Sequence, residues 1–364
     1  MANLPNWAIG LIAGLSSALL YAAASGGAGL ALVLAYVAPL PIFVAGLGWG
    51  TAAATVGGVT GLVVIAAAAG ISNAVVYFSV AALGPIWLTR LALLSRPVGG
   101  RGPAAEARAA RAREAHHRAV AEGTRDGPPP PPESAALQWY PAGRLIVWAT
   151  LIAAALLTLT IISLSAAEGG IRGAVAQMIN TGIVDTGELS RLLDAQGLDV
   201  SAQDFLRTVA TLVPAMAASM WLVMTMLNMM LAQLVVERSG QALRPTPDPA
   251  SIDYPRAFHL VLPVAVILSF VPGESGYAAA SVAAVLFVPY FLLGLAVIHA
   301  ISRGWRARAP MLAAVYVCII LFGWVIIPVG MLGIVEAWAG LRARHVTPGD
   351  DTPGDDTPSG GNRA

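Results

Sequence analysis

Serine and histidine side chains are the first place to look for chemistry in this sequence. Gly273, Glu274, Ser275 and Gly276 match the G-x-S-G pattern in which some intramembrane proteases carry a nucleophilic serine. Such a serine needs a histidine base within hydrogen-bond reach. His299 lies 24 residues further along the same predicted helix, about 36 Å away, and His259 lies at the far end of the preceding apolar segment. We therefore interpret the motif as a turn.

Other catalytic and metal-binding chemistries lack their residues. All 21 residues counted as Lys or Arg are Arg, so the chain has no lysine for a phosphate-binding loop or a Schiff base. Met216, Met220 and Met224 recur at every fourth position, but no His or Cys accompanies them, which favours packing over a Cu(I) path. Cys318 is the single cysteine. We expect no enzyme activity, no cofactor and no metal, and any use of ATP requires a partner.

Isolated polar side chains within apolar segments are the remaining candidates. They are Asn228, Tyr290 and Glu336, with His299 near the end of its segment. Polar groups at membrane depth are costly, and we consider them as parts of a solute or ion pathway. For Glu336 the alternative is a side chain that reaches the membrane interface beside Arg342, and for His299 the same beside Arg303.

The elements that position these residues are membrane-spanning helices. The chain has 364 residues, of which 57% are hydrophobic and only 11% are charged. Apolar runs of about 18 residues or more cross the hydrocarbon layer as helices. The sequence predicts an all-α transmembrane bundle with nine or ten spans, depending on whether 309–341 forms one helix or two. A cleaved signal peptide is the alternative for the first run, and we expect a retained helix because no basic residue precedes it.

Polar segments divide the chain into four regions. Residues 1–95 form an N-terminal membrane region, and 96–143 form an Arg/Pro-rich loop. Residues 144–341 form a second membrane region with an acidic outer segment at 167–204, and 342–364 form a disordered tail. Arginine excess marks cytoplasmic loops, so we place the loop and the C-terminus inside the cell. A helix at 104–122 is interpreted as solvated, with anionic lipid or RNA as alternative ligands, and we predict no specific nucleic-acid partner.

Helix boundaries and packing faces are also predicted. Ser201 and Asp204 have capping-box spacing, so a long helix is expected from there to about residue 236. Gly10 with Gly14, and Gly57 with Gly61, are small-residue pairs that allow close helix approach. Such pairs serve either packing within the bundle or docking of a partner subunit.

A set of short patterns resembles a known bacterial family. The patterns are Leu40-Pro41-Ile42 with Gly46-Leu47-Gly48-Trp49, Gly84-Pro85 with Trp87, Ser239-Gly240 with Arg244-Pro245, Pro289-Tyr290-Phe291 through Gly294 to His299, and Phe322-Gly323-Trp324. They resemble domain of unknown function 2232 in its alphaproteobacterial form, distantly similar to substrate-binding subunits of energy-coupling-factor transporters. The resemblance implies capture of a small molecule within the bundle, driven by a separate ATPase and a coupling membrane subunit.

The expected function is therefore transport-related solute binding in the bacterial inner membrane, with lipids as neighbours. The alternative is a non-catalytic scaffold for envelope assembly. A transport component should have a polar-lined cavity near Asn228 and Tyr290, whereas a scaffold should have a closed core.

Overall fold

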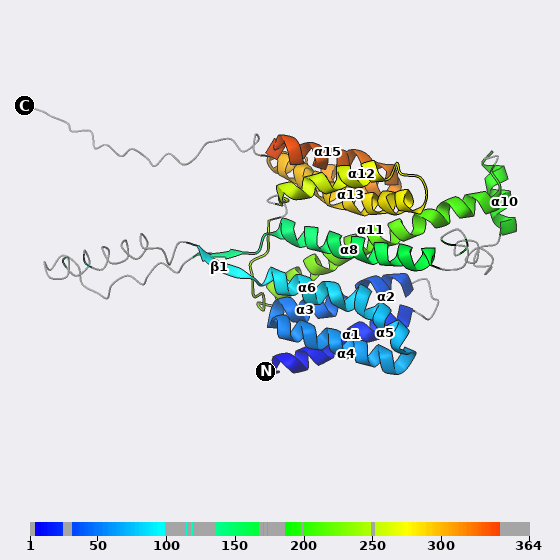
Figure 1. Ribbon diagram of the computed structural model, residues 1–364. Helices are drawn as coiled ribbons and strands as arrows, with labels where there is room; N and C mark the ends of the chain where they lie inside the picture. The colour runs from blue at the N-terminus through cyan, green and yellow to red at the C-terminus, as the bar shows by residue number, and fades with distance from the viewer. Residues whose placement is uncertain are drawn as a thin grey trace, which may run out of the picture.

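The computed structural model shows a helical bundle in three parts (Figure 1). The helices before residue 95 pack together on one side, α8 and α11 cross the middle, and α12, α13 and α15 pack together on the other side. The structure describes residues 4–24, 31–98, 114, 118, 136–166, 170, 173, 186–197, 200–248 and 252–342. The predicted loop helix at 104–122, most of the acidic segment before residue 186 and the tail after 342 lie outside these residues.

Short helices joined by tight turns build the N-terminal part. Gly50 and Gly70 have φ values of 98° and 87°, which glycine adopts without strain, and each of them ends a helix. The helices are α1 (Asn6–Ala24), α2 (Ala31–Val37), α3 (Leu40–Trp49), α4 (Thr51–Ala69), α5 (Ile71–Tyr77), the π-helical segment η1 (Phe78–Ala82) and α6 (Leu83–Ala92).

A two-stranded ribbon is the exception to the predicted all-α class. Strand β1 (Ser95–Val98) pairs antiparallel with β2 (Ala136–Trp139), with Ser95 opposite Trp139. The ribbon leaves one end of the bundle (Figure 1). It brings the two ends of the polar loop together, so α8 (Ala142–Ser165) starts beside the end of α6.

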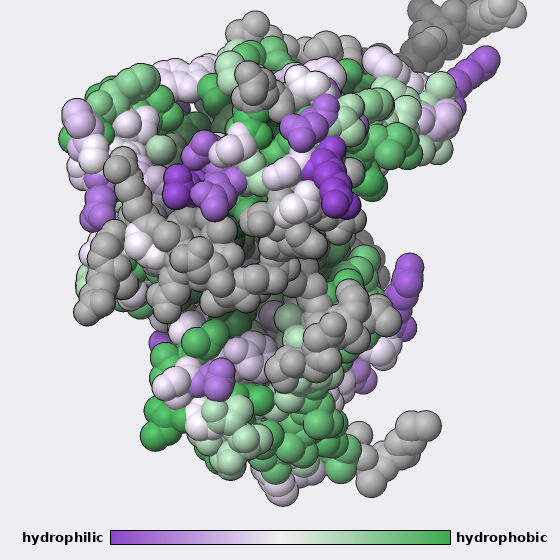
Figure 2. Space-filling view, turned by 90° about the vertical axis from the view of Figure 1, so that its right-hand side faces the viewer, coloured by the Kyte–Doolittle hydropathy of each residue, from purple (hydrophilic) through white to green (hydrophobic). Residues whose placement is uncertain are grey.

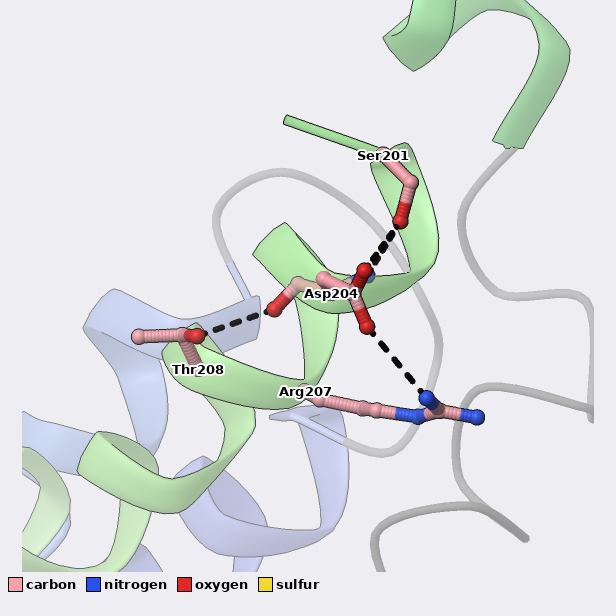
Figure 3. Close-up of polar contacts among 4 residues, drawn as sticks. All are labelled: Ser201, Asp204, Arg207 and Thr208. Atoms are coloured by element: carbon pink, nitrogen blue, oxygen red, sulfur yellow. Dashed lines mark hydrogen bonds and ion pairs between the residues drawn. The ribbon is translucent and has the colours of Figure 1, made fainter. Parts of the chain in front are cut away.

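The long helix α11 (Ala202–Arg238) begins at the predicted cap. The Ser201 hydroxyl oxygen accepts a hydrogen bond from the Asp204 backbone N–H at 3.1 Å, and the hydroxyl donates to the Asp204 carboxylate at 2.7 Å (Figure 3). Arg207 pairs with the same carboxylate at 3.3 Å. The 37 residues of α11 span about 55 Å, well over the hydrocarbon thickness, and α10 (Thr186–Ala195) packs near its protruding start.

The C-terminal part contains a broken helix pair. The elements are the 3₁₀ segment η3 (Arg256–Leu260), α12 (Val261–Leu268), α13 (Glu274–Ile301), the 3₁₀ turns η4 (Ser302–Gly304) and η5 (Gly323–Val325), α14 (Arg308–Leu321) and α15 (Ile326–Ala339). The last apolar stretch bends by 116° at Phe322. Pro328 and Gly330 both lie inside α15, where Pro328 occupies the first turn and costs no hydrogen bond.

The number of long apolar helices is smaller than expected. Among the described residues, six helices are long and apolar enough to cross a membrane, or seven if the bent pair counts as one span. Residues 33–49 and 256–268 form shorter apolar helices. The prediction of nine or ten spans is therefore not confirmed, whereas a multi-pass helical membrane protein is.

The surface agrees with a membrane environment. Phe270, Ile320 and Ile71 are 82%, 79% and 78% exposed, and hydrophobic residues form patches beside hydrophilic ones on the face seen in Figure 2. Arginines gather at the opposite end of the bundle, where the ribbon lies. They include Arg90, Arg96, Arg144, Arg238, Arg244, Arg256, Arg303, Arg306, Arg308 and Arg342.

Candidate solute-binding cavity

A cavity of about 370 Å³ lies between the N-terminal part and the two central helices. Helix α11 lines it with Pro214, Ala217, Ala218, Trp221, Met224, Thr225 and Asn228. These positions recur at every third or fourth residue, so they share one face of the helix. Helix α8 adds Ala153, Leu156, Leu157 and Thr160, and the N-terminal part adds Tyr21, Ala35, Tyr36, Pro39 and Val80.

The wall of this cavity is almost entirely apolar, which differs from the polar lining that the sequence predicts. Small side chains such as Ala153 and Ala218 leave the volume open, and none of the described residues that line it is Asp, Glu, Arg or His. A charged ligand would lose its hydration there without gaining a partner. The cavity therefore suits an uncharged, largely apolar molecule.

Asn228 lies on this wall, as expected for a pathway residue, and it is 4% exposed. Its Nδ2 donates hydrogen bonds to the carbonyl oxygens of Tyr36 at 2.6 Å and Met224 at 2.8 Å. Tyr36 is in the last turn of α2, where helix carbonyls lack a partner from their own helix. The amide of Asn228 thus joins α11 to α2.

Trp221 makes a second bond of the same kind, which sequence reasoning missed. Its Nε1 donates to the Val80 carbonyl oxygen at 2.7 Å. Val80 is in the π-helical segment, where a carbonyl pairs with the fifth residue onward, and that residue is Pro85, which has no N–H. The signal was available in the sequence, because Trp221 lies seven residues before Asn228 and so on the same helix face.

Tyr290 lies at a different place, in a groove of about 200 Å³ lined by His259, Leu262, Pro263, Val266, Tyr290, Ile334 and Trp338. The Tyr290 hydroxyl is 3.4 Å from His259 Nδ1. Nearby, the Tyr254 hydroxyl donates to the Pro289 carbonyl oxygen at 2.8 Å, and burial raises the pKa of Tyr254, which keeps the phenol protonated. Asn228 and Tyr290 therefore do not form one site.

His299 and Glu336 have local partners. His299 Nδ1 is 2.9 Å from the Leu295 carbonyl oxygen, and Nε2 is 3.5 Å from the Tyr316 hydroxyl. The Glu336 carboxylate accepts hydrogen bonds from Arg342 Nε at 2.7 Å and from the Arg342 backbone N–H at 3.1 Å. Neither residue lines the cavity around Asn228.

The predicted glycine pairs lie at contacts inside the bundle. A Cβ on Gly10 would be 2.6 Å from the Ala53 carbonyl oxygen, and Gly57 faces Gly10 and Gly14 in return, so α1 packs closely on α4. Gly61 lies against the Tyr77 ring. A second close contact, between α13 and α15, was missed by the sequence analysis and involves Gly294, Gly330 and Gly333.

The remaining motifs carry no assembled chemistry in the part of the chain that the structure describes. Ser275 lies in the first turn of α13. The residue before this helix is Gly273, whose φ of 90° agrees with a turn. No group of three His, Cys, Asp or Glu residues there could hold a metal ion. Met216 and Met220 are exposed, whereas Met224 lines the cavity.

Comparison with known proteins gives one match. A family model described as "Predicted membrane protein (DUF2232)" matches residues 139–336, more than half of the chain. The matched region includes α8 and α11, which form one wall of the cavity, whereas the helices of the opposite wall precede it. No curated protein and no solved structure matches the chain.

Proposed function

Because the chain belongs to the DUF2232 family of predicted membrane proteins, we propose that it is a transport-related component of the bacterial inner membrane that binds a small, partly apolar solute among its helices. The observation that carries this proposal is the cavity beside Asn228. It reaches from the middle of α8, at Ala153, toward the end of the bundle where α10 lies. A cavity at this depth is where a membrane protein can hold a solute away from both surfaces.

Energy coupling is assigned to other proteins in this proposal. A chain without lysine has no phosphate-binding loop of the common type, so ATP hydrolysis would fall to a separate ATPase with its coupling membrane subunit. The resemblance to substrate-binding subunits of energy-coupling-factor transporters supports that division of labour. The chain itself acts without catalysis and without a cofactor.

Orientation follows from the segregation of arginines. Basic residues near membrane ends stay in the cytoplasm. We therefore assign to the inside the end of the bundle that carries the ribbon, which also holds Gln241 and the C-terminal side of α15. The same assignment counts 256–268 as a span and α14 and α15 as a helical hairpin.

Single-cysteine labelling tests this orientation. In a Cys318→Ser background, Gln196→Cys lies at the α10 end and Gln241→Cys at the ribbon end, and both positions are exposed. A membrane-impermeable maleimide applied to intact spheroplasts should label Gln196→Cys and leave Gln241→Cys unlabelled until the membrane is broken. The reverse pattern would show that the arginine-rich end faces outward.

Purification in mild detergent tests the solute and the partners together. Ala218 lines the cavity, so Ala218→Phe should fill part of it and abolish retention of a small molecule that mass spectrometry detects with the wild-type protein. Met216→Phe is the matched control, because Met216 lies on the same helix but is 63% exposed away from the cavity lining. An ATPase and a membrane subunit should accompany all three proteins.

Two results would contradict the proposal. Equal retention of the small molecule by Ala218→Phe would mean that the cavity does not hold it. Recovery of envelope-assembly proteins without any ATPase would instead support the alternative, a non-catalytic membrane scaffold.

A further inference from the structure

Two polar atoms beside the cavity at Asn228 have no hydrogen-bond partner in the part of the chain that the structure describes. Thr225 is 2% exposed and Asn228 is 4% exposed, and both line the cavity. Both Asn228 bonds use Nδ2, so within the described part of the chain Oδ1 accepts no hydrogen bond. The Thr225 hydroxyl likewise has no hydrogen-bond partner there.

The two atoms belong to one polar spot. Residues three apart on a helix are neighbours on its surface, so Thr225 and Asn228 present their side chains side by side on α11. A Cβ on Gly84 would lie 3.5 Å from the Thr225 methyl carbon, so the methyl side of Thr225 faces α6. The rest of the wall is apolar.

Buried polar groups in native proteins nearly always have a partner, and unpaired ones call for an explanation. We propose that the ligand of this cavity is an uncharged molecule with an apolar body and a single hydrogen-bond-donating head, such as an alcohol, whose head binds Asn228 Oδ1 and the Thr225 hydroxyl. The inference rests on the proposed solute-binding function and narrows the class of solute. An amide oxygen only accepts hydrogen bonds, so the head must donate.

Among the described residues, no charged side chain lines the cavity, which argues against two neighbouring ligand classes. A fatty-acid carboxylate or an alkylammonium would be buried without a counter-ion, which is far more costly than burying a hydroxyl. A plain hydrocarbon would fill the volume but leave both polar atoms unpaired. Sites built for a hydroxyl discriminate strongly against analogues that lack it.

Competition among isosteric compounds tests the inference in the full-length protein in lipid nanodiscs. An octanol carrying a diazirine is photolysed, and labelled peptides are identified by mass spectrometry. Four competitors are titrated, and the concentration of each in the membrane is compared: 1-octanol, 1-methoxyheptane, n-nonane and octylammonium. We expect 1-octanol to prevent labelling of the cavity peptides at a concentration about tenfold lower than either methoxyheptane or nonane requires. Octylammonium should not compete.

The methoxyheptane comparison isolates the need for a donor without altering Asn228, whose amide also joins α11 to α2. Thr225→Val then removes one polar atom with little change of shape, and it should reduce the preference for octanol over nonane several-fold. Ser281→Ala is the control, because Ser281 is also buried in a helix but does not line the cavity.

The outcomes separate this inference from the function it rests on. Equal competition by nonane and octanol in the wild-type protein would overturn the inference and leave an apolar solute site standing, provided that Ala218→Phe still abolishes labelling. If Ala218→Phe leaves the labelling of cavity peptides unchanged, the proposed function fails as well.

Discussion

Replacing Gly333 with alanine should destabilise the protein by about 3 kcal/mol, a change of more than a hundredfold in the folding equilibrium. A Cβ at this position would overlap the carbonyl oxygen of Tyr290 on α13, and it would lie 2.8 Å from the Gly294 backbone nitrogen. These are backbone atoms, which cannot rotate away as a flexible side chain does. Helices α13 and α15 would have to separate.

Separation of these helices would have consequences beyond one contact. Gly294 approaches the Val329 backbone just as closely, so both helices contribute glycines to the same contact. In a bilayer, helix association depends on such close packing because lipid chains are as apolar as the side chains. The contact between α13 and α15 is therefore expected to carry much of the stability of the C-terminal part.

The measurement is the loss of helical signal on titration with SDS in mixed micelles. Gly304→Ala is the matched control, because a Cβ on Gly304 would meet nothing within 4 Å and no positive φ is required there. We expect that variant to unfold within about 0.5 kcal/mol of the wild type. A Gly333→Ala protein as stable as the control would show that the helices do not pack as closely as the structure has them.

Removing the carboxylate of Glu336 should have a similarly large effect, on the order of 3 kcal/mol for Glu336→Ala. The ion pair with Arg342 has a nitrogen–oxygen distance of 2.7 Å, and the exposed side-chain fractions are 16% for Arg342 and 5% for Glu336. Removing Glu336 leaves the mostly buried guanidinium of Arg342 without the carboxylate that offsets its lost hydration. The same carboxylate also accepts the Arg342 backbone N–H, so the end of α15 would lose a cap.

Glu336→Gln separates these two contributions. The amide oxygen can still accept one hydrogen bond but carries no charge, so an intermediate loss is expected. Arg207→Gln provides the comparison with an exposed pair, since both partners of the Arg207 pair are more than half exposed, and its loss should stay below about 1 kcal/mol. Wild-type stability of Glu336→Ala, combined with loss of solute retention, would instead support the pathway role considered from the sequence.

Local features of the sequence predicted several elements correctly. The capping pair Ser201 and Asp204 starts α11 as predicted, because a cap depends on a few consecutive residues. Asn228 was a candidate because it is polar within an apolar stretch, and it does line the cavity. The family resemblance was confirmed over residues 139–336.

Features made by distant segments were not predicted. The ribbon between residues 95 and 139 and the contact of Gly294 with Gly333 each depend on neighbours far along the chain, whereas two helices in 309–341 were among the predicted alternatives. The predicted number of spans was not confirmed, because an apolar run shows that a segment avoids water but not how long its helix remains unbroken.

The sequence by itself determined that this chain is a helical membrane protein without lysine chemistry, because composition and apolar run length decide those properties residue by residue. Only the tertiary structure decided that Asn228 and Tyr290 belong to different places, and that Thr225 and Asn228 line the same apolar cavity. The physical reason is that a cavity exists where side chains from several helices fail to meet, and no single helix records where the others end.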